Sequence, residues 1–221
     1  MQIAFLHTLA ANQTLFESFI APSGLDRLAS IVHHSAPQLL QYASAVGLDD
    51  ELASMVEQQI VQLEAQGADW IVCTCSSIGA LAEQAKTRFA QVMRVDRPMA
   101  IEASQSGHIK VLAALATTIN PTINLLAEYD ADIAQRSTVE VIPEAWAHYL
   151  AGDNDAYLAT IAQYITQHCQ DDGCIVLAQA SMAPAILQLD QATRQRALTS
   201  PSLCLDYLLA ELEHNNNGDS Q

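Results

Sequence analysis

Short, almost uninterrupted apolar runs recur along the chain, separated by longer segments in which apolar residues have helical spacing. Six runs have the length of strands: Ile3–His7, Trp70–Thr74, Val92–Val95, Ile109–Leu115, Val139–Ile142 and Ile175–Ala178. A continuous apolar run, rather than an alternating one, is typical of a strand covered on both faces in a parallel sheet.

The segments between these runs have the spacing and the flanking residues of helices. Predicted helices cover Leu25–His33, Asp49–Gln66, Ile78–Phe89, Met99–Ser106, Pro121–Ile133, Asn154–Cys169, Pro184–Leu189 and Ser202–Glu213. Strands that alternate with helices predict βα units, and therefore an α/β fold with parallel sheets.

The two halves of the chain are similar to each other. The run from Trp70 matches the run from Cys174 at an offset of 174 − 70 = 104 residues, and Ile3 matches Ile109 at 109 − 3 = 106. Two nearly equal offsets in the same order predict two similar parallel-sheet α/β lobes. A single continuous sheet is the alternative.

The charge and composition restrict the partners. Nine basic residues stand against 25 acidic ones, which gives a net charge of −16, and half of the 221 residues are hydrophobic. Such a chain repels polyanions, so we expect neither nucleic acid nor an anionic membrane surface as a partner. An anionic substrate would be held locally, by backbone N–H groups and hydroxyls.

The cysteines indicate a reducing compartment. Five cysteines in a chain of this size do not predict a disulfide framework. The N-terminal segment lacks a positively charged stretch before its apolar residues, and no apolar run reaches the roughly 18 residues of a membrane span. We therefore expect a cytoplasmic protein. The spacing Cys73-x-Cys75 does not match the usual zinc arrangements, so no metal site is predicted.

The residues that follow the predicted strands are the candidates for chemistry. Ligands of open α/β sheets bind beyond the carboxyl ends of the strands. Small hydroxyl residues stand there in all four cases: after His7, after Cys75, after Ala116 and after Gln179. The field at the start of a following helix favours the thiolate form of a cysteine such as Cys75, which makes it a candidate acid/base or nucleophile. The alternative for Cys75 is an inert packing residue.

Four segments together resemble the aspartate/glutamate racemase superfamily, which includes hydantoin racemases, maleate isomerases and arylmalonate decarboxylases. They are GADWIVCTCSSIG (67–79), RVDRPMAIEA (94–103), KVLAALATTINPT (110–122) and IVLAQASM (175–182), and within the superfamily the CSS and AQASM loops mark a narrower branch. The resemblance spans nearly the whole chain. It implies two lobes related by a pseudo-twofold axis, and we expect the first lobe at 1–96 plus 200–215 and the second at 97–199. The C-terminal residues 216–221 are polar and without periodicity, so we expect a frayed tail there.

The resemblance also implies cofactor-independent chemistry with one cysteine from each lobe. Cys75 matches the first-lobe cysteine, whereas Gln179 stands where the second is expected, and a neutral amide cannot exchange a proton near pH 7. Cys174 lies at the start of its strand and cannot replace it. The positions implied to contact a small carboxylate substrate are His7, Thr8, Ser76, Ser77, Asp96, Thr117, Thr118, Gln179, Ser181 and Met182.

Three kinds of chemistry stay open for Cys75. It could protonate an enolate from one face after decarboxylation or another C–C cleavage, and it could add to the double bond of an unsaturated diacid. It could also share proton transfer with another acid, for which Asp96 and Glu102 are the nearest candidates. The predicted function is thus an isomerase or lyase acting at the α-carbon of a small carboxylic acid. A non-catalytic carboxylate-binding protein and a metal-dependent hydrolase are the alternatives, and a homodimer is plausible by resemblance.

Overall fold

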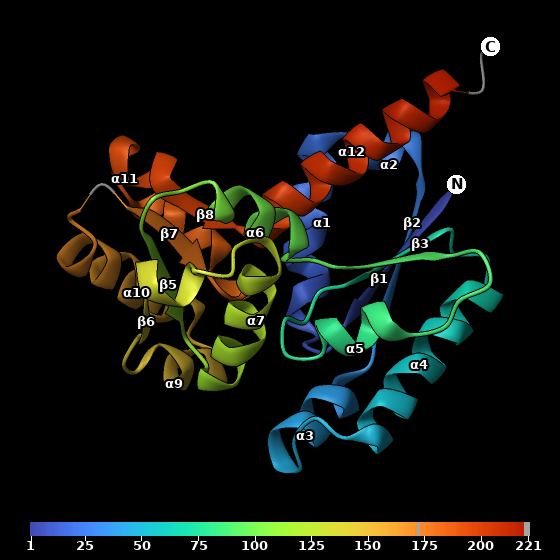
Figure 1. The fold of residues 1–221 in the computed structure, drawn as a ribbon, viewed down its shortest axis with the longest axis horizontal. Helices are drawn as coiled ribbons and strands as arrows, with labels where there is room; N and C mark the ends of the chain where they lie inside the picture. Colours follow the sequence, from blue (N-terminus) through green and yellow to red (C-terminus); the bar gives the residue numbers. More distant parts are fainter. Residues whose placement is uncertain (172, 219–221) are drawn as a thin grey trace. The chain divides into compact units, whose positions relative to one another are not determined.

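A computed structural model describes residues 1–171 and 173–218, and the chain divides into two compact units (Figure 1). Unit 1 consists of Met1–Val95 together with Pro201–Gln221, and unit 2 consists of Asp96–Ser200. Each unit is an α/β structure with its own parallel sheet, and each is described here by itself.

Unit 1 contains a four-stranded sheet with the order β2-β1-β3-β4. All pairs are parallel, and Leu6 of β1 lies opposite Cys73 of β3 and His34 of β2. Its elements are β1 (Gln2–His7), α1 (Ala11–Ser23), α2 (Leu25–Leu28), β2 (Ser30–Ser35), α3 (Pro37–Ala45), α4 (Asp50–Ala65), β3 (Trp70–Cys73), α5 (Gly79–Gln84), β4 (Gln91–Arg94) and most of α12 (Ser200–Gly218).

Unit 2 contains a second four-stranded parallel sheet with the order β6-β5-β7-β8. Its elements are α6 (Arg97–Ser104), β5 (Ile109–Ala113), η1 (Ala116–Thr118), α7 (Ile119–Tyr129), α8 (Ile133–Arg136), β6 (Ser137–Val141), α9 (Ala145–Leu150), α10 (Asn154–His168), β7 (Cys174–Leu177), η2 (Ala180–Gln188), α11 (Gln191–Arg196) and β8 (Ala197–Thr199). The elements η1 and η2 are 3₁₀-helices.

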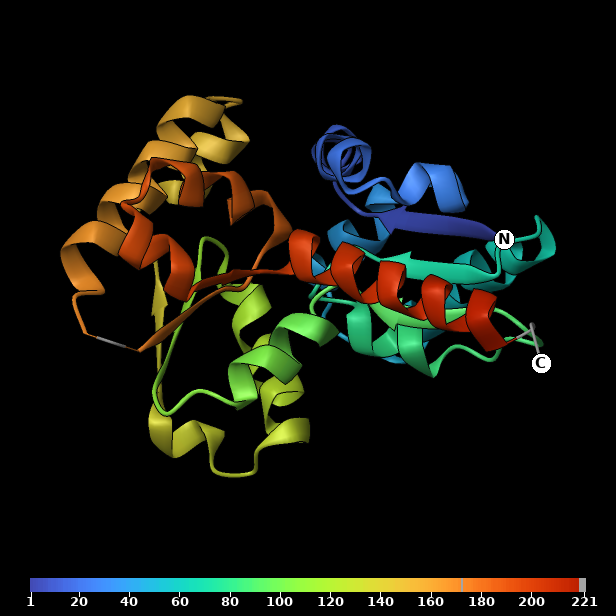
Figure 2. The same ribbon diagram turned by 90° about the horizontal axis from the view of Figure 1, so that it is seen from above.

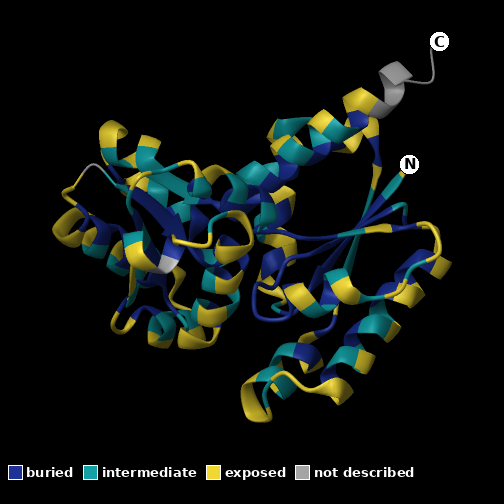
Figure 3. Cartoon of the chain, in the orientation of Figure 1, coloured by how far each residue is buried: buried dark blue, intermediate teal, exposed yellow. Residues whose placement is uncertain are grey.

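The two sheets have the same strand order when each is read along the chain. In both, the first strand lies between the second and the third, and the fourth lies beyond the third. The prediction of two similar parallel-sheet units is therefore confirmed, and the single continuous sheet is excluded. Figure 3 shows that β1, β3, β5 and β7 are mostly buried, as their continuous apolar runs predict.

Each face of the unit 1 sheet is covered by helices because successive side chains of a strand point to opposite faces. Ala4 and Leu6 of β1 pack into the apolar cluster that includes Val56 and Ile60 of α4. Phe5 points to the other face, where its ring lies 5.4 Å from that of Phe16 in α1. The helix α12 lies across the strands of unit 1 in Figure 2, and its Tyr207 meets Trp70 of β3 edge to face.

The predicted helix Leu25–His33 is wrong. A four-residue helix ends at Leu28, and the chain then forms the strand β2, which carries the β-branched pair Ile31-Val32. β2 is an edge strand with no fully buried residue, so it lacks the continuous apolar run that identified the central strands. The three-residue edge strand β8 and the helix α1 were not predicted either.

A buried carboxylate fixes the loop that precedes β4. One oxygen of Glu64, near the end of α4, accepts three backbone N–H groups, from Arg88, Phe89 and Ala90, each at 2.8 Å. These bonds stabilise the charged form and hold the pKa of Glu64 below its ordinary value. A glutamate on the buried face of α4 thus serves as an acceptor for backbone N–H groups.

The helix α12 extends to Gly218, beyond the end that the apolar pattern predicts at Glu213, because helical hydrogen bonding needs no apolar stripe. Residues 219–221, which end the predicted frayed tail, lie outside the described residues. In the described part of the chain, no helix combines the length and the apolar character that crossing a membrane requires. All five cysteines are buried thiols rather than disulfides.

Candidate functional site

The carboxyl ends of β1 and β3 lie side by side in unit 1 and carry most of the predicted site residues of that unit. The backbone N–H of Thr74 donates to the carbonyl of Leu6 at 3.0 Å, which joins the two strand ends. Thr8 follows one strand, and the sequence Cys75-Ser76-Ser77 follows the other. The topology therefore brings the two predicted loops of unit 1 together, as expected for neighbouring parallel strands.

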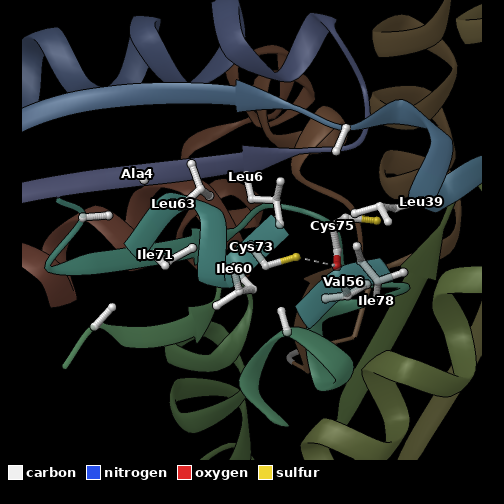
Figure 4. Close-up of a cluster of buried hydrophobic side chains, with 14 of the residues drawn as sticks. Ala4, Leu6, Leu39, Val56, Ile60, Leu63, Ile71, Cys73, Cys75 and Ile78 are labelled. Atoms are coloured by element: carbon white, nitrogen blue, oxygen red, sulfur yellow. Dashed lines mark hydrogen bonds between the residues drawn. The ribbon is translucent and has the colours of Figure 1, made fainter. Parts of the chain in front are cut away.

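Cys75 lies at the edge of the apolar core of unit 1, with 8% of its surface exposed. Its side chain belongs to the cluster that contains Leu39, Val56 and Ile78, as Figure 4 shows. The thiol of Cys73, two residues earlier in the chain, lies 3.7 Å from the carbonyl oxygen of Cys75 (dashed in Figure 4). Cys73 is completely buried, as is typical of a cysteine that packs as a small apolar side chain.

A buried arginine supports the Cys75 loop from the neighbouring strand. Arg94 is the last residue of β4, lies opposite Cys73 and is only 1% exposed. Its Nη2 donates to the carbonyl oxygen of Ser76 at 3.3 Å. The side chain passes so close to Gly79 that a Cβ there would lie 2.8 Å from the Cβ of Arg94. Glycine is thus required at the start of α5 to let the guanidinium reach the loop.

His7 is the centre of a buried hydrogen-bonded chain. The hydroxyl of Thr74 donates to the Leu6 carbonyl at 3.1 Å, because a carbonyl can only accept. The Nδ1 of His7, 2.9 Å away, must then be the protonated nitrogen that donates to the same hydroxyl oxygen. Its Nε2 accepts from the Nδ1 of His33 at 2.8 Å. The bonding fixes both tautomers and uses both ring nitrogens of His7 within unit 1.

The environment of His7 keeps it neutral. Burial lowers the pKa of His7 to about 3, and the nearby charges of His33 and His34 act in the same direction. Burial also lowers the pKa of His33, while Glu17 opposes that shift. His7 is therefore not an imidazolium acid near neutral pH. Its neutral ring donates through Nδ1–H to Thr74, the residue before Cys75. The predicted direct contact of His7 with substrate has no ring nitrogen left to make it.

Three buried polar atoms of unit 1 have no hydrogen-bond partner among the described residues. They are the hydroxyl oxygens of Thr8 and Ser77 and the amide oxygen of Asn12. A buried polar group without a partner costs about 1–3 kcal/mol, so such groups in a native structure point to a ligand or to water. Thr8 and Ser77 were predicted from their positions, whereas Asn12 and Arg94 were missed.

In unit 2, the side chain of Gln179 binds two backbone N–H groups of the neighbouring strand-end loop. Its side-chain oxygen accepts the backbone N–H of Ala114 at 2.6 Å and that of Leu115 at 2.9 Å. These N–H groups belong to the loop that follows β5, and Gln179 is the second residue after β7. The glutamine that stands in place of the expected second cysteine thus binds its own backbone as a substrate oxygen would.

The other predicted residues of unit 2 are also engaged internally, with one exception. The hydroxyl of Thr118 donates to the Leu115 carbonyl at 2.6 Å, and the hydroxyl of Ser181 lies 2.9 Å from that of Tyr157. Met182 is fully buried in the apolar cluster of unit 2, and its N–H donates to the carbonyl of Gln179 at 3.0 Å. Thr117 is the exception, because it is exposed.

The two alternative acids occupy different places in unit 2. Asp96 is fully buried at the start of α6, and its carbonyl accepts the N–H of Ala100. Glu102 is exposed and lines a cavity of about 640 Å³ with Cys174, the first residue of β7. This cavity lies at the amino ends of the strands, opposite the edge at which Gln179 stands. Glu102 is therefore not placed to act with residues at the carboxyl ends.

A metal centre is not indicated at any of these positions. In the ranges 1–171 and 173–218, no three histidine, cysteine, aspartate or glutamate side chains converge in a way that could hold an ion. The thiols of Cys73 and Cys75 point into the apolar cluster of unit 1, and His7 is bonded at both nitrogens.

Solved structures with a similar fold include several racemases. The chain is similar to a glutamate racemase from Bacillus anthracis, with a TM-score of 0.68 at 17% identity, covering 97% of this chain and 82% of that one. The aspartate racemase of Picrophilus torridus gives a TM-score of 0.68 at 13% identity, covering 96% and 94%. An allantoin racemase from Klebsiella pneumoniae gives 0.62 at 16% identity, covering 97% and 89%. Comparison of the sequence with protein-family models and with curated proteins finds no match.

Proposed function

Because the chain has the fold of aspartate, glutamate and allantoin racemases, we propose that it is an isomerase or lyase acting at the α-carbon of a small carboxylic acid. Cys75 is the acid/base in this proposal, and the chemistry needs no cofactor. The observation that carries it is the pair of buried hydroxyls of Thr8, on the loop after β1, and Ser77, on the loop of Cys75, which have no partner among the described residues.

Those hydroxyls suit a carboxylate. Each hydroxyl donates one hydrogen bond, and a carboxylate offers about four acceptor positions on its two oxygens. A carboxylate that binds both hydroxyls would remove two buried unsatisfied groups from unit 1 and would lie beside the loop that carries Cys75. Proximity of this kind is a major part of catalysis, since it replaces a bimolecular encounter by a positioned one.

The proposed chemistry proceeds from one face of the substrate. The Cys75 sulfur removes the α-proton or returns one to an enolate, and hydroxyl and N–H donors stabilise the negative charge on the carboxylate oxygens. Gln179 does not exchange protons, because it is a neutral amide with its oxygen bonded to two N–H groups. One-face chemistry leads to exchange with retention, or to stereospecific protonation after decarboxylation.

A carboxylate-binding protein without catalysis is the second candidate, and the packing of Cys75 favours it. The thiol lies among Leu39, Val56 and Ile78 and is only 8% exposed, a setting that suits an inert cysteine. In that case the hydroxyls of Thr8 and Ser77 would still bind the acid, and removal of the sulfur would leave binding unchanged.

Deuterium exchange at the α-carbon separates the two candidates. Wild type, Cys75→Ala and Cys169→Ala are incubated in D₂O with amino acids, hydroxy acids, hydantoins and malonates and followed by NMR. Cys169, a buried cysteine of unit 2, is the matched control. Exchange, or label in a decarboxylated product, that vanishes only in Cys75→Ala supports the proposal. Binding of an acid to wild type without any Cys75-dependent exchange or turnover supports the binder.

A further inference from the structure

Asn12 provides a hydrogen-bond acceptor at the candidate site, and it stands apart from the predicted residues. Its side chain is 4% exposed, and its amide oxygen is buried without a partner in the described chain. Unlike a hydroxyl, an amide oxygen can only accept. A ligand that satisfies this atom must therefore present an N–H or O–H group to it.

The course of α1 places Asn12 at the carboxyl edge of the unit 1 sheet. The buried residues of this helix are Asn12, Phe16 and Ile20, which recur every four residues and form one face toward the sheet. The ring of Phe16 lies 5.7 Å from that of His7, the last residue of β1. Asn12 lies one turn earlier, or about 6 Å further along the axis at 1.5 Å per residue.

That direction leads beyond the strand end and toward the loops of the site. Only Thr8, Leu9 and Ala10 separate β1 from α1, and the N–H of Asn12 donates to the Leu9 carbonyl at 3.0 Å. The helix therefore begins at the carboxyl edge and runs back over the sheet. Asn12 thus stands on the same edge as Thr8 and Ser77, the other two buried groups without a partner.

From this arrangement we infer that Asn12 is a specificity-determining residue and that the ligand is an acid bearing a hydrogen-bond donor near its α-carbon. The inference rests on the proposed function and narrows its substrate class. Thr8 and Ser77 donate to the carboxylate, while the oxygen of Asn12 accepts from an α-amino, α-hydroxy or ureido group. Malonate and unsaturated diacid dianions carry no such donor and would leave Asn12 unsatisfied.

The preference for a ligand with a hydrogen-bond donor should be large enough to measure. A site built to pair with a ligand N–H or O–H discriminates strongly against the analogue that lacks it, because its own buried group is then left unpaired. We expect at least tenfold tighter binding for the donor-bearing member of a matched pair. Lactate against propionate is the stricter pair because the two differ only in the hydroxyl, and aspartate against succinate adds a pair in which the donor also carries a positive charge.

Titration calorimetry of these pairs tests the inference on wild type, Asn12→Leu, Asn12→Asp and Cys75→Ser. Asn12→Leu keeps the approximate size and removes the acceptor, so the preference should fall to within about twofold. Asn12→Asp keeps the acceptor and adds charge, so it should favour the amino acid over the hydroxy acid. Retention of the far-ultraviolet circular dichroism spectrum and of the cooperative melt shows that each variant is folded.

Equal binding of both members of every pair to wild type overturns the inference, and is expected if the Asn12 oxygen meets only an internal water. A preference that survives in Asn12→Leu overturns it as well. Absence of binding by all four acids also overturns it for these donor classes. The proposed function is judged separately. A donor preference that persists in Cys75→Ser, with no isotope exchange in wild type, refutes catalysis and leaves the role of Asn12 intact. Isotope exchange in wild type without a donor preference refutes the role of Asn12 and leaves the proposed function intact.

Discussion

Protonation of His7 should unfold unit 1 in acid, because the folded protein holds this ring neutral. Its pKa is lowered from 6.5 to about 3, chiefly by burial. Between these values the unfolded chain binds one more proton than the folded one. Stability therefore rises with pH in this window and is lost as the pH falls from 6.5 toward 3. The hydrogen-bonded chain acts in the same direction as burial, since a second proton on His7 would oppose the N–H of His33.

The magnitude follows from the shift. A difference of about 3.5 units at about 1.36 kcal/mol per unit corresponds to roughly 5 kcal/mol when fully developed. At pH 4 the folded ring is still neutral and the unfolded ring is charged, so about 3 kcal/mol should be lost between pH 7 and pH 4. That is a large part of the 5–15 kcal/mol by which a typical domain is stable.

Urea unfolding at fixed ionic strength and pH 7, 6, 5 and 4 measures the effect. A Trp146→Phe background leaves Trp70 of unit 1 as the single tryptophan reporter. His7→Gln cannot titrate, so wild type should lose about 3 kcal/mol more than this variant between pH 7 and 4. His214→Gln, at an exposed position on α12, is the control and should behave as wild type. Equal pH dependence in wild type and His7→Gln would refute the buried neutral chain.

Two further predictions concern buried anchors of unit 1. Gly79→Ala should destabilise unit 1 by about 1–3 kcal/mol and speed alkylation of Cys75 by iodoacetamide, because the new Cβ would lie 2.8 Å from the Cβ of Arg94. Gly107→Ala, with nothing within 4 Å, is its control, and equal losses in the two variants would contradict the reasoning. Glu64→Gln should destabilise the protein at pH 7 and make little difference in strong acid, since the lowered pKa of Glu64 gives stability that is lost as the pH falls. Urea melts at pH 7 and pH 3 measure the difference in stability between wild type and Glu64→Gln. An equal difference at both pH values would show that the charge of Glu64 does not stabilise the fold.

The central strands and the repeat were predictable because the sequences of these strands are continuous apolar runs. β1, β3, β5 and β7 are covered on both faces, so their sequences carry a clear signal. The edge strand β2 has one exposed surface and two histidines, and its composition gave no such run. Its assignment as a helix failed because period-based reasoning needs a consistent buried face, which this strand lacks.

The site was predictable in position and much less in bonding. Sequence placed Thr8, Cys75 and Ser77 at strand ends, which the topology then brings together. Arg94 and Asn12 gave no signal because each reads as an ordinary residue of a strand end or of a helix. Their importance comes from tertiary facts: complete burial of a guanidinium under a loop, and an amide oxygen without a partner.

Gln179 marks a difference in hydrogen bonding between two units that share one strand order. In unit 1 the hydroxyls of Thr8 and Ser77 have no partner among the described residues, whereas in unit 2 the N–H groups of Ala114 and Leu115 donate to the side chain of Gln179. Removing the acceptor leaves two buried N–H groups unpaired, at about 1–3 kcal/mol each. Gln179→Ala should therefore loosen the loop after β5, while Gln179→Glu keeps an acceptor in place.

Amide hydrogen exchange of Ala114 and Leu115, followed by NMR, reads this loop directly. Exchange should quicken by tenfold or more in Gln179→Ala, since about 1.4 kcal/mol corresponds to a factor of ten. Added acetate should slow it again in that variant alone, because a carboxylate oxygen can take the place of the amide oxygen. Unchanged exchange in Gln179→Ala would show that these donors do not depend on Gln179. Rescue by acetate would mean that the glutamine occupies a carboxylate site, so that Gln179→Cys would introduce a thiol and open that site at once.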